Sequence, residues 1–229
     1  MADARLRDLE RQALTDPEAR AEWILCQLRR DAFPPYRVEL CARLGDDAAR
    51  AAMNLPGRAR LDLQLGRSLA EHGTDLTCRV ALAAGAAATR AEGDESALRA
   101  LNEVLSIAHQ LYRERTKRGA KALAVAITTA SRLRTRHKGA EAVRTAGHAV
   151  CLEPRSNAIW QSWYAGRSLE AAIEAPGLPA IQRTIVDEVV PWVLGLDDPL
   201  EIGTAPPSPP VKGPNPVAPS SWWTAIFGK

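Results

Sequence analysis

The stretch GDESALRALNEVLSIAHQLYRER, residues 93–115, decides the fold class of this chain. Its apolar residues recur with the i, i+3, i+7 spacing that places them on one side of a helix. The residues that follow this spacing are Leu98, Leu101, Leu105, Ala108 and Leu111 or Tyr112. The stretch therefore predicts a long core helix against which other elements pack.

Helix start and stop signals surround this stretch. Thr15 or Asp16 followed by Pro17 is typical of a helix start, and Gly45 followed by Asp46 predicts a tight turn between two short helices. No segment alternates apolar and polar residues in the way a half-buried strand does. Further helices are expected through Leu61, Leu65 and Leu69, from Asp75 to near Gly93, over 120–136, 139–152 and 156–175, and from Pro179 to a kink or end at Pro191.

These signals predict an all-α domain over residues 1–202, built as a helical bundle or as an irregular α-helical array that includes solenoid-like stacking as one form. The chain has 229 residues, of which 46% are hydrophobic, enough for a proper core. Its N-terminus is charged from the third residue, and no segment approaches about 18 uninterrupted apolar residues. We therefore expect no transmembrane segment and a cytoplasmic location.

The segment that follows, residues 203–221, is rich in proline. Such a composition favours extended polyproline II without internal hydrogen bonds, and it is typical of a disordered linker. Its prolines are Pro206, Pro207, Pro209, Pro210, Pro214, Pro216 and Pro219. The sequence thus predicts a spacer between the helical domain and the last residues, 222–229.

The chain ends in PSSWWTAIFGK, residues 219–229, which concentrates aromatic side chains after the spacer. One helical turn would gather four of them on a single side, as anchors of a docking peptide: Trp222, Trp223, Ile226 and Phe227. The peptide has three alternatives: it docks on a protein partner, folds back on its own domain, or makes a weak contact with a membrane interface. The spacer favours a protein partner or a larger assembly, and this layout resembles that of encapsulin cargo proteins.

A basic region lies between Arg113 and Lys138, with nine basic residues against the single acid Glu114. The net charge of the whole chain is only +3, so the rest of the chain is slightly acidic. The basic residues flank an apolar helix at both of its ends, where they face solvent or contact phosphates or an acidic partner. They are Arg113, Arg115, Lys117, Arg118, Lys121, Arg132, Arg134, Arg136 and Lys138.

Motifs that carry chemistry are missing. The four cysteines form no CxxC pair, and the four histidines are scattered, so we expect neither a metal site nor a cofactor. No phosphate loop, GxSxG, HExxH or dinucleotide fingerprint occurs. The expected function is that of a non-catalytic interaction or adaptor protein, with nucleic-acid binding through the basic region as the alternative.

Two segments carry resemblances. RVELCARLGDDAARAAM, residues 37–53, resembles a pattern of uncharacterised all-helical bacterial proteins, which implies a helical fold and no particular activity. The matching positions are Arg37, Val38, Glu39, Leu40, Leu44, Gly45, Asp46, Ala48, Ala49, Arg50 and Ala51, whereas Cys41 and Arg43 depart from the pattern. Residues 147–175 are similar to the junction of two tetratricopeptide repeats, although no second copy follows at that period. This likeness rests on Leu152, Pro154, Asn157, Ala158, Trp160, Gly166, Ala172 and Ile173.

Overall fold

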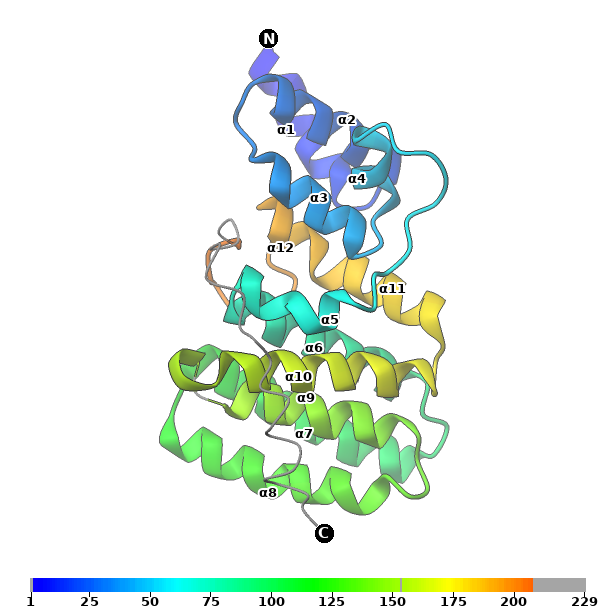
Figure 1. Cartoon of the computed structure of the whole chain (residues 1–229), viewed down its shortest axis with the longest axis vertical. Helices are drawn as coiled ribbons and strands as arrows, with labels where there is room; N and C mark the ends of the chain where they lie inside the picture. The colour runs from blue at the N-terminus through cyan, green and yellow to red at the C-terminus, as the bar shows by residue number, and fades with distance from the viewer. Residues whose placement is uncertain (1, 153, 208–229) are drawn as a thin grey trace, which may run out of the picture.

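The computed structural model describes residues 2–152 and 154–207 (Figure 1). The described residues form helices joined by turns and loops, with no β-strand, so the predicted all-α fold is confirmed. The elements are α1 (Ala2–Ala13), α2 (Pro17–Arg29), α3 (Pro35–Arg43), α4 (Asp47–Ala52), α5 (Leu65–Ser68), the 3-10 helix η1 (Leu69–His72), α6 (Thr74–Arg90), α7 (Glu95–Glu114), α8 (Lys117–Leu133), α9 (Gly139–Cys151), α10 (Pro154–Ile173), α11 (Leu178–Glu188) and α12 (Val190–Leu194).

Side-chain caps explain where several of these helices begin. Asp16, Asp46, Asp94 and Thr116 each precede a helix and accept a hydrogen bond from a backbone N–H two or three residues later. Such a bond satisfies one of the N–H groups that a helix start leaves without a partner. The predicted long core helix is α7, which begins directly after Asp94.

The helix expected through Leu61 and Leu69 is shorter than predicted. It begins only at Leu65 and continues as the 3-10 helix η1 up to Gly73. The backbone before it is bonded by Gln182 of α11, whose side chain accepts from the Leu61 N–H at 3.2 Å and donates to the Ala59 carbonyl at 3.1 Å. This tertiary contact holds the segment in a loop, which a periodic pattern alone does not reveal.

Helices far apart in the sequence lie side by side. In the lower half of Figure 1, α9 contacts α6, α7, α8 and α10, and α10 also packs on α5 and α6. The last helices then return toward the N-terminal part, where α11 packs on α6 and α12 on α3. A solenoid joins each unit mainly to its sequence neighbours. The arrangement is therefore an irregular helical array.

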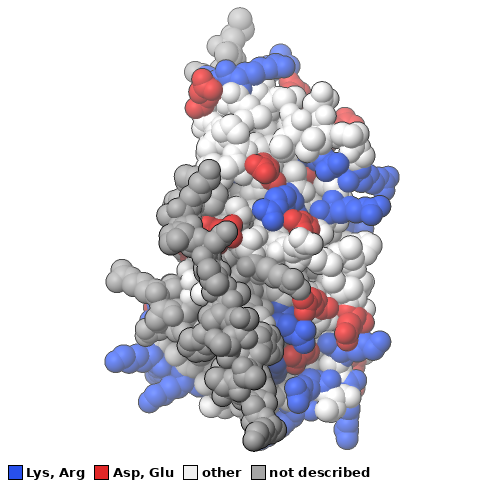
Figure 2. Space-filling model, viewed as in Figure 1, with Lys and Arg blue, Asp and Glu red and all other residues white. Residues whose placement is uncertain are grey.

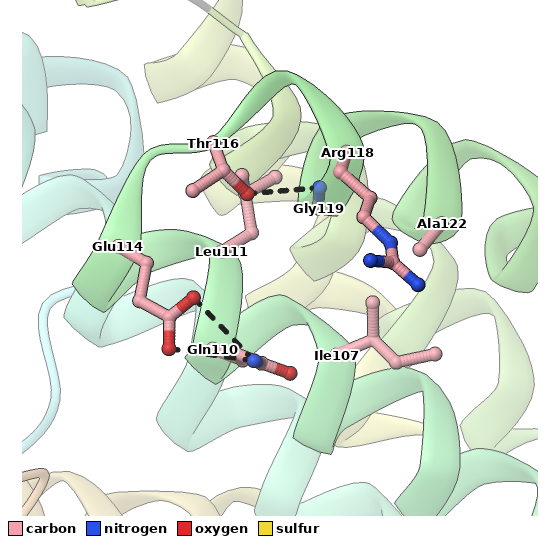
Figure 3. A pocket seen from close by; sticks show the side chains of 8 residues that line it. All are labelled: Ile107, Gln110, Leu111, Glu114, Thr116, Arg118, Gly119 and Ala122. Carbon is pink, nitrogen blue, oxygen red and sulfur yellow. Dashed lines mark hydrogen bonds between the residues drawn. The ribbon is translucent and has the colours of Figure 1, made fainter.

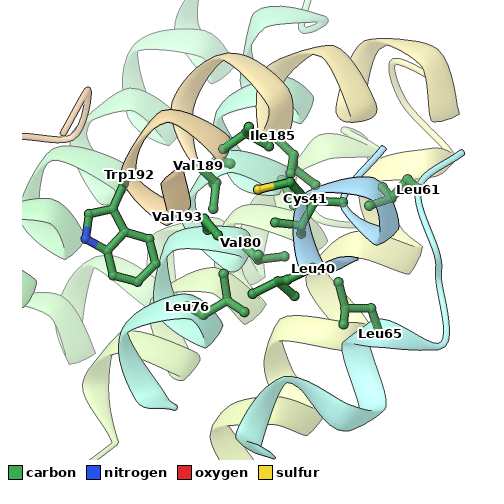
Figure 4. Packing of buried hydrophobic residues seen from close by; sticks show 14 of the residues in the cluster. Leu40, Cys41, Leu61, Leu65, Leu76, Val80, Ile185, Val189, Trp192 and Val193 are labelled. Carbon is green, nitrogen blue, oxygen red and sulfur yellow. The ribbon is translucent and has the colours of Figure 1, made fainter. Parts of the chain in front are cut away.

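Helix α6 joins the two parts of the hydrophobic core. Leu76 and Val80 point into the cluster that α3, α11 and α12 share (Figure 4), whereas Cys78 and Leu82 belong to the cluster formed with α7, α8 and α9. The many alanines of α6 allow neighbouring helices to approach closely. Gly66 of α5 and Gly166 of α10 also approach closely, because a Cβ on Gly66 would lie 2.8 Å from the Gly166 Cα.

The chain remains attached to this body beyond Ile202, where the linker is expected to begin. The side chain of Arg79 on α6 is fully buried and forms an ion pair with Asp198. It also donates to the Thr204 hydroxyl at 3.1 Å, and the Trp192 indole N–H donates to the Thr204 carbonyl at 2.8 Å. The Pro207 carbonyl accepts a hydrogen bond from the Tyr36 hydroxyl. Residues 203–207 thus contact the helical body.

Candidate functional site

An aromatic face is exposed on the N-terminal half of α10. Ile159, Trp160 and Trp163 have exposed fractions of 67%, 46% and 42%. Their i, i+1, i+4 spacing places them on one side of the helix. Large apolar side chains that lie together at the surface are typical of interaction sites. We call Ile159, Trp160, Trp163 and the adjacent Tyr164 the α10 face.

The rings of this face contact one another in series. The ring centroids of Trp160 and Trp163 lie 6.0 Å apart, and those of Trp163 and Tyr164 lie 4.9 Å apart, both edge to face. Tyr164 stacks in turn on His148 of α9 at 4.8 Å. Burial and the charge of nearby Arg144 lower the pKa of His148, so this ring is largely uncharged at neutral pH. The series orders the exposed rings.

Hydrogen bonds on the opposite side of α10 fix its rotation about its axis. The Ser162 hydroxyl donates to the Gly66 carbonyl at 2.9 Å, and the Ser168 hydroxyl donates to the Ala142 carbonyl at 2.8 Å. Both serines are buried, so these bonds form where water does not compete. Because Ser162 faces inward, its neighbours Trp160 and Trp163 point toward solvent.

All nine residues of the predicted basic region are exposed. Five of them surround the α7–α8 junction and form the first basic cluster: Arg113, Arg115, Lys117, Arg118 and Lys121. Four surround the α8–α9 junction and form the second basic cluster: Arg132, Arg134, Arg136 and Lys138. The structure therefore brings each set together but keeps the two sets apart, at opposite ends of a 17-residue helix about 25 Å long. Figure 2 shows Lys and Arg side chains on both sides of this end of the molecule.

The two clusters differ in their relation to the dipole of α8. Arg132 lies in the last turn, where a cation is stabilised by the negative end of the helix dipole. Lys117 and Arg118 lie in the first turn, which contains no acidic residue and where the dipole disfavours a cation. Within the described part of the chain, none of the nine residues forms an ion pair with a carboxylate. Arg113 lies in the last turn of α7, where the dipole stabilises a cation, but dipole compensation does not account for Lys117 and Arg118.

A groove of about 450 Å³ runs beside the first basic cluster, between α7 and α8 (Figure 3). Its apolar lining includes Ile107 and Leu111, and Arg118 and Glu114 lie on opposite sides of it. The carboxylate of Glu114 accepts a hydrogen bond from the Gln110 amide at 3.3 Å. The groove thus combines an apolar lining with charged edges, a composition that fits a side chain of a bound segment.

Two buried thiols and one buried phenol have raised pKa values that keep them uncharged. Burial raises the pKa of the Cys78 thiol to about 12 and raises that of Cys41 well above its ordinary value. Burial, the neighbouring Cys78 and the hydrogen bond to Asp75 raise the pKa of Tyr112. A thiol in this state is a poor nucleophile because the thiolate is the reactive form. These groups therefore stabilise the core as neutral side chains.

No group of three or more His, Cys, Asp or Glu side chains within residues 2–152 and 154–207 is arranged to hold a metal ion. In the same residues, every helix is too short or too polar to cross a bilayer.

The predicted docking residues Trp222, Trp223, Ile226 and Phe227 lie outside the described residues. The α10 face was not predicted, although Ile159, Trp160 and Trp163 repeat the i, i+1, i+4 spacing recognised at the C-terminus. The sequence did not reveal this face because Gln161 and Ser162 are polar, as surface residues usually are, yet both are buried. No protein-family model, curated protein or solved structure matches this chain.

Proposed function

We propose that this chain is a non-catalytic interaction protein whose helical body and C-terminal peptide each present aromatic side chains to protein segments. The observation that carries the proposal is the α10 face, where Trp160 and Trp163 are exposed beside Ile159. Interface hot spots are enriched in tryptophan and tyrosine because these rings bury a large area and lose few rotamers. The second element is the peptide that contains Trp222 and Trp223.

The geometry around the α10 face supports this proposal. The stacking series from Trp160 to His148 orders the rings in advance, and preorganised contacts reduce the entropy lost on binding. The serine bonds beneath α10 prevent the helix from rotating these rings inward. An apolar surface held outward in this way contacts water at a cost of about 25 cal/mol per Å². A bound protein segment removes that cost.

The test is affinity capture from a lysate of the organism that encodes the chain, with matched variants. A tagged chain with Trp160→Ala and Trp163→Ala is compared with the wild type and with Val125→Ala. Val125 is a suitable control because it is an apolar residue of α8 with an exposed fraction of 71%. We expect a partner that the wild type and the control retain and that the tryptophan variant loses. A fourth chain carries Trp222→Ala and Trp223→Ala. The proposal would be contradicted if all four chains captured the same proteins.

Nucleic-acid binding is the second candidate function, favoured by the placement of the first basic cluster. Lys117 and Arg118 of this cluster lie in the first turn of α8, which contains no acidic residue, so an approaching phosphate meets both these side chains and the helix dipole. The second cluster lies about 25 Å away along α8. Both clusters would contact the backbone of one nucleic-acid strand or duplex without reading its sequence.

A salt titration tests this candidate. The logarithm of the binding constant of the wild type for a generic duplex should fall linearly with the logarithm of the salt concentration, because the release of counterions drives binding. Replacement of Lys117, Arg118 and Lys121 by glutamine should lower the slope by about three, one for each lost phosphate contact. Lack of salt-dependent binding at low ionic strength would rule the candidate out.

A further inference from the structure

The α10 face has no described neighbour that covers it, although it is the most aromatic part of the described surface. The residues outside the description include one segment of matching chemistry, residues 222–229. Trp222, Trp223, Ile226 and Phe227 would present two indoles, a phenyl ring and a branched chain on one side of a helical turn. The α10 face presents the same kinds of group with the same spacing.

We propose that residues 222–229 bind to the α10 face of the same chain. The proposal rests on the proposed function, because it identifies the first occupant of that interaction surface. The aromatic side chains of the peptide and of the α10 face would bury one another through edge-to-face and offset contacts. Such contacts add stabilisation to that gained from the surface removed from water. A partner protein must then displace the peptide before it can reach the α10 face.

The point where the described chain ends supports an intramolecular contact. The chain is held at Asp198 by Arg79, at Thr204 by Trp192 and at Pro207 by Tyr36. Figure 1 shows the last described residues, in orange, and the N-terminal end of α10 on the same side of the view. The chain thus leaves the body from an attached point that lies on the same side of this view as the N-terminal end of α10.

The length of the intervening chain also supports the contact. Residues 208–221 separate Pro207 from the peptide, and a proline-rich segment extends by about 3 Å per residue, or about 40 Å in all. A body of this size has a radius of gyration of about 17 Å. The extended spacer is therefore more than twice as long as this radius, enough to span a large part of the body. A tether holds its peptide at a high effective concentration near the body, so even a weak contact with the α10 face is populated within one chain.

Photo-cross-linking in the full-length chain tests the proposal. Thr224→benzoylphenylalanine places the cross-linker between the anchor residues without removing any of them. Light and heavy-isotope-labelled chains are mixed at low micromolar concentration, irradiated and analysed by mass spectrometry. We expect cross-links to the α10 segment around Ile159 to Arg167, and we expect them within chains of a single label.

Matched variants identify the face. Trp160→Ala together with Trp163→Ala should reduce the yield of these cross-links by about fivefold or more, because buried aromatics carry most of the energy of such contacts. Val125→Ala should leave the yield unchanged. The variants change exposed residues, and equal thermal unfolding confirms that each body is folded.

Cross-links that join light to heavy chains would overturn the proposal, because a second copy would then be the occupant. Cross-links to helices other than α10 would overturn it as well. So would an equal yield of cross-links from the wild type and the Trp160→Ala, Trp163→Ala variant. The capture experiment is independent of these results. A partner lost with Trp160 and Trp163 supports the proposed function even if the peptide cross-links elsewhere, and a peptide on the α10 face without any captured partner supports only the intramolecular contact.

Discussion

Arg79 and Asp198 form an ion pair that attaches the C-terminal end of the helical body to its central helix. The guanidinium is fully buried, lies 4.2 Å from the ring centroid of Trp192, and donates to both carboxylate oxygens of Asp198. Asp198 also accepts from the backbone N–H groups of Ile202 and Gly203 at 2.9 and 2.7 Å. One buried cation thus organises the turn through which the chain leaves the body.

Replacing Asp198 with asparagine should destabilise the protein by about 3 kcal/mol, since the buried Arg79 then lacks a countercharge. The free energy of unfolding in urea measures this loss. The control is Glu170→Gln, which removes an exposed ion pair with Arg167 and should cost about 0.5 kcal/mol or less. Equal losses from the two variants would show that Arg79 does not depend on Asp198.

The same pair should make stability depend on acid. Partial burial opposes ionisation of Asp198, but hydrogen bonds from Arg79 and from the Gly203 and Ile202 amides hold its pKa below the ordinary value of 3.8. Because the folded-state pKa is the lower one, the stabilisation is complete above about pH 4 and is lost as the pH falls toward the folded-state pKa. Urea unfolding of the wild type and Asp198→Asn between about pH 5 and about pH 3 should therefore show a difference that shrinks with acid. A constant difference would contradict this assignment.

Three histidines should weaken the fold at a milder pH. Burial is the largest cause that lowers the pKa values of His72, His109 and His148 from 6.5, and nearby arginines act in the same direction. The unfolded chain therefore binds protons more readily, so the free energy of unfolding should fall as the pH drops from neutral through 6.5. His109→Gln should reduce that fall, as measured by urea unfolding at about pH 7.5 and about pH 5. An equal free energy of unfolding of the wild type at the two pH values would show that burial does not lower the pKa values of these three histidines.

The sequence predicted the helices well because their signals are local. Caps at Asp16 and Asp46 and the periodicity of residues 93–115 act within a few turns, and the structure contains each of them. The loop around Leu61 was missed because its backbone partner, Gln182, is more than a hundred residues away in sequence. Local patterns contain no information on such a pairing.

The candidate site was predictable only in part, for the same reason. Charge runs are visible in sequence, and the basic residues are indeed exposed in two clusters. The α10 face depends on which side of the helix is buried, and that side is selected by Gly66 and Ala142 through Ser162 and Ser168. Likewise, Arg79 reads as an ordinary surface arginine until Asp198 and Trp192 enclose it.

The cysteines should differ in reactivity. Cys41 and Cys78 are buried, and burial raises the pKa of each thiol, whereas Cys26 and Cys151 are partly exposed. An aromatic disulfide reagent that gives a coloured product should react with at most two thiols of the native protein within minutes. After denaturation it should react with all four. Rapid reaction of all four in the native state would mean that the core around α3 and α6 opens readily.

The crossing of α5 and α10 should tolerate no side chain at Gly66. A Cβ there would lie 2.8 Å from the Gly166 Cα, and backbone cannot move aside as a flexible side chain can. Gly66→Ala should therefore lower the free energy of unfolding by about 1–3 kcal/mol. Gly93→Ala is the control, because its Cβ would meet nothing within 4 Å and its backbone does not have a positive φ. We expect Gly93→Ala to be neutral or slightly stabilising, since alanine reduces the entropy of the unfolded chain.

The Ser162 hydroxyl donates a hydrogen bond to the Gly66 carbonyl, so displacement of α5 should also disturb the rotation of α10. A Gly66→Ala chain as stable as the control would show that the two helices separate without cost, and that this crossing does not hold the α10 face in place.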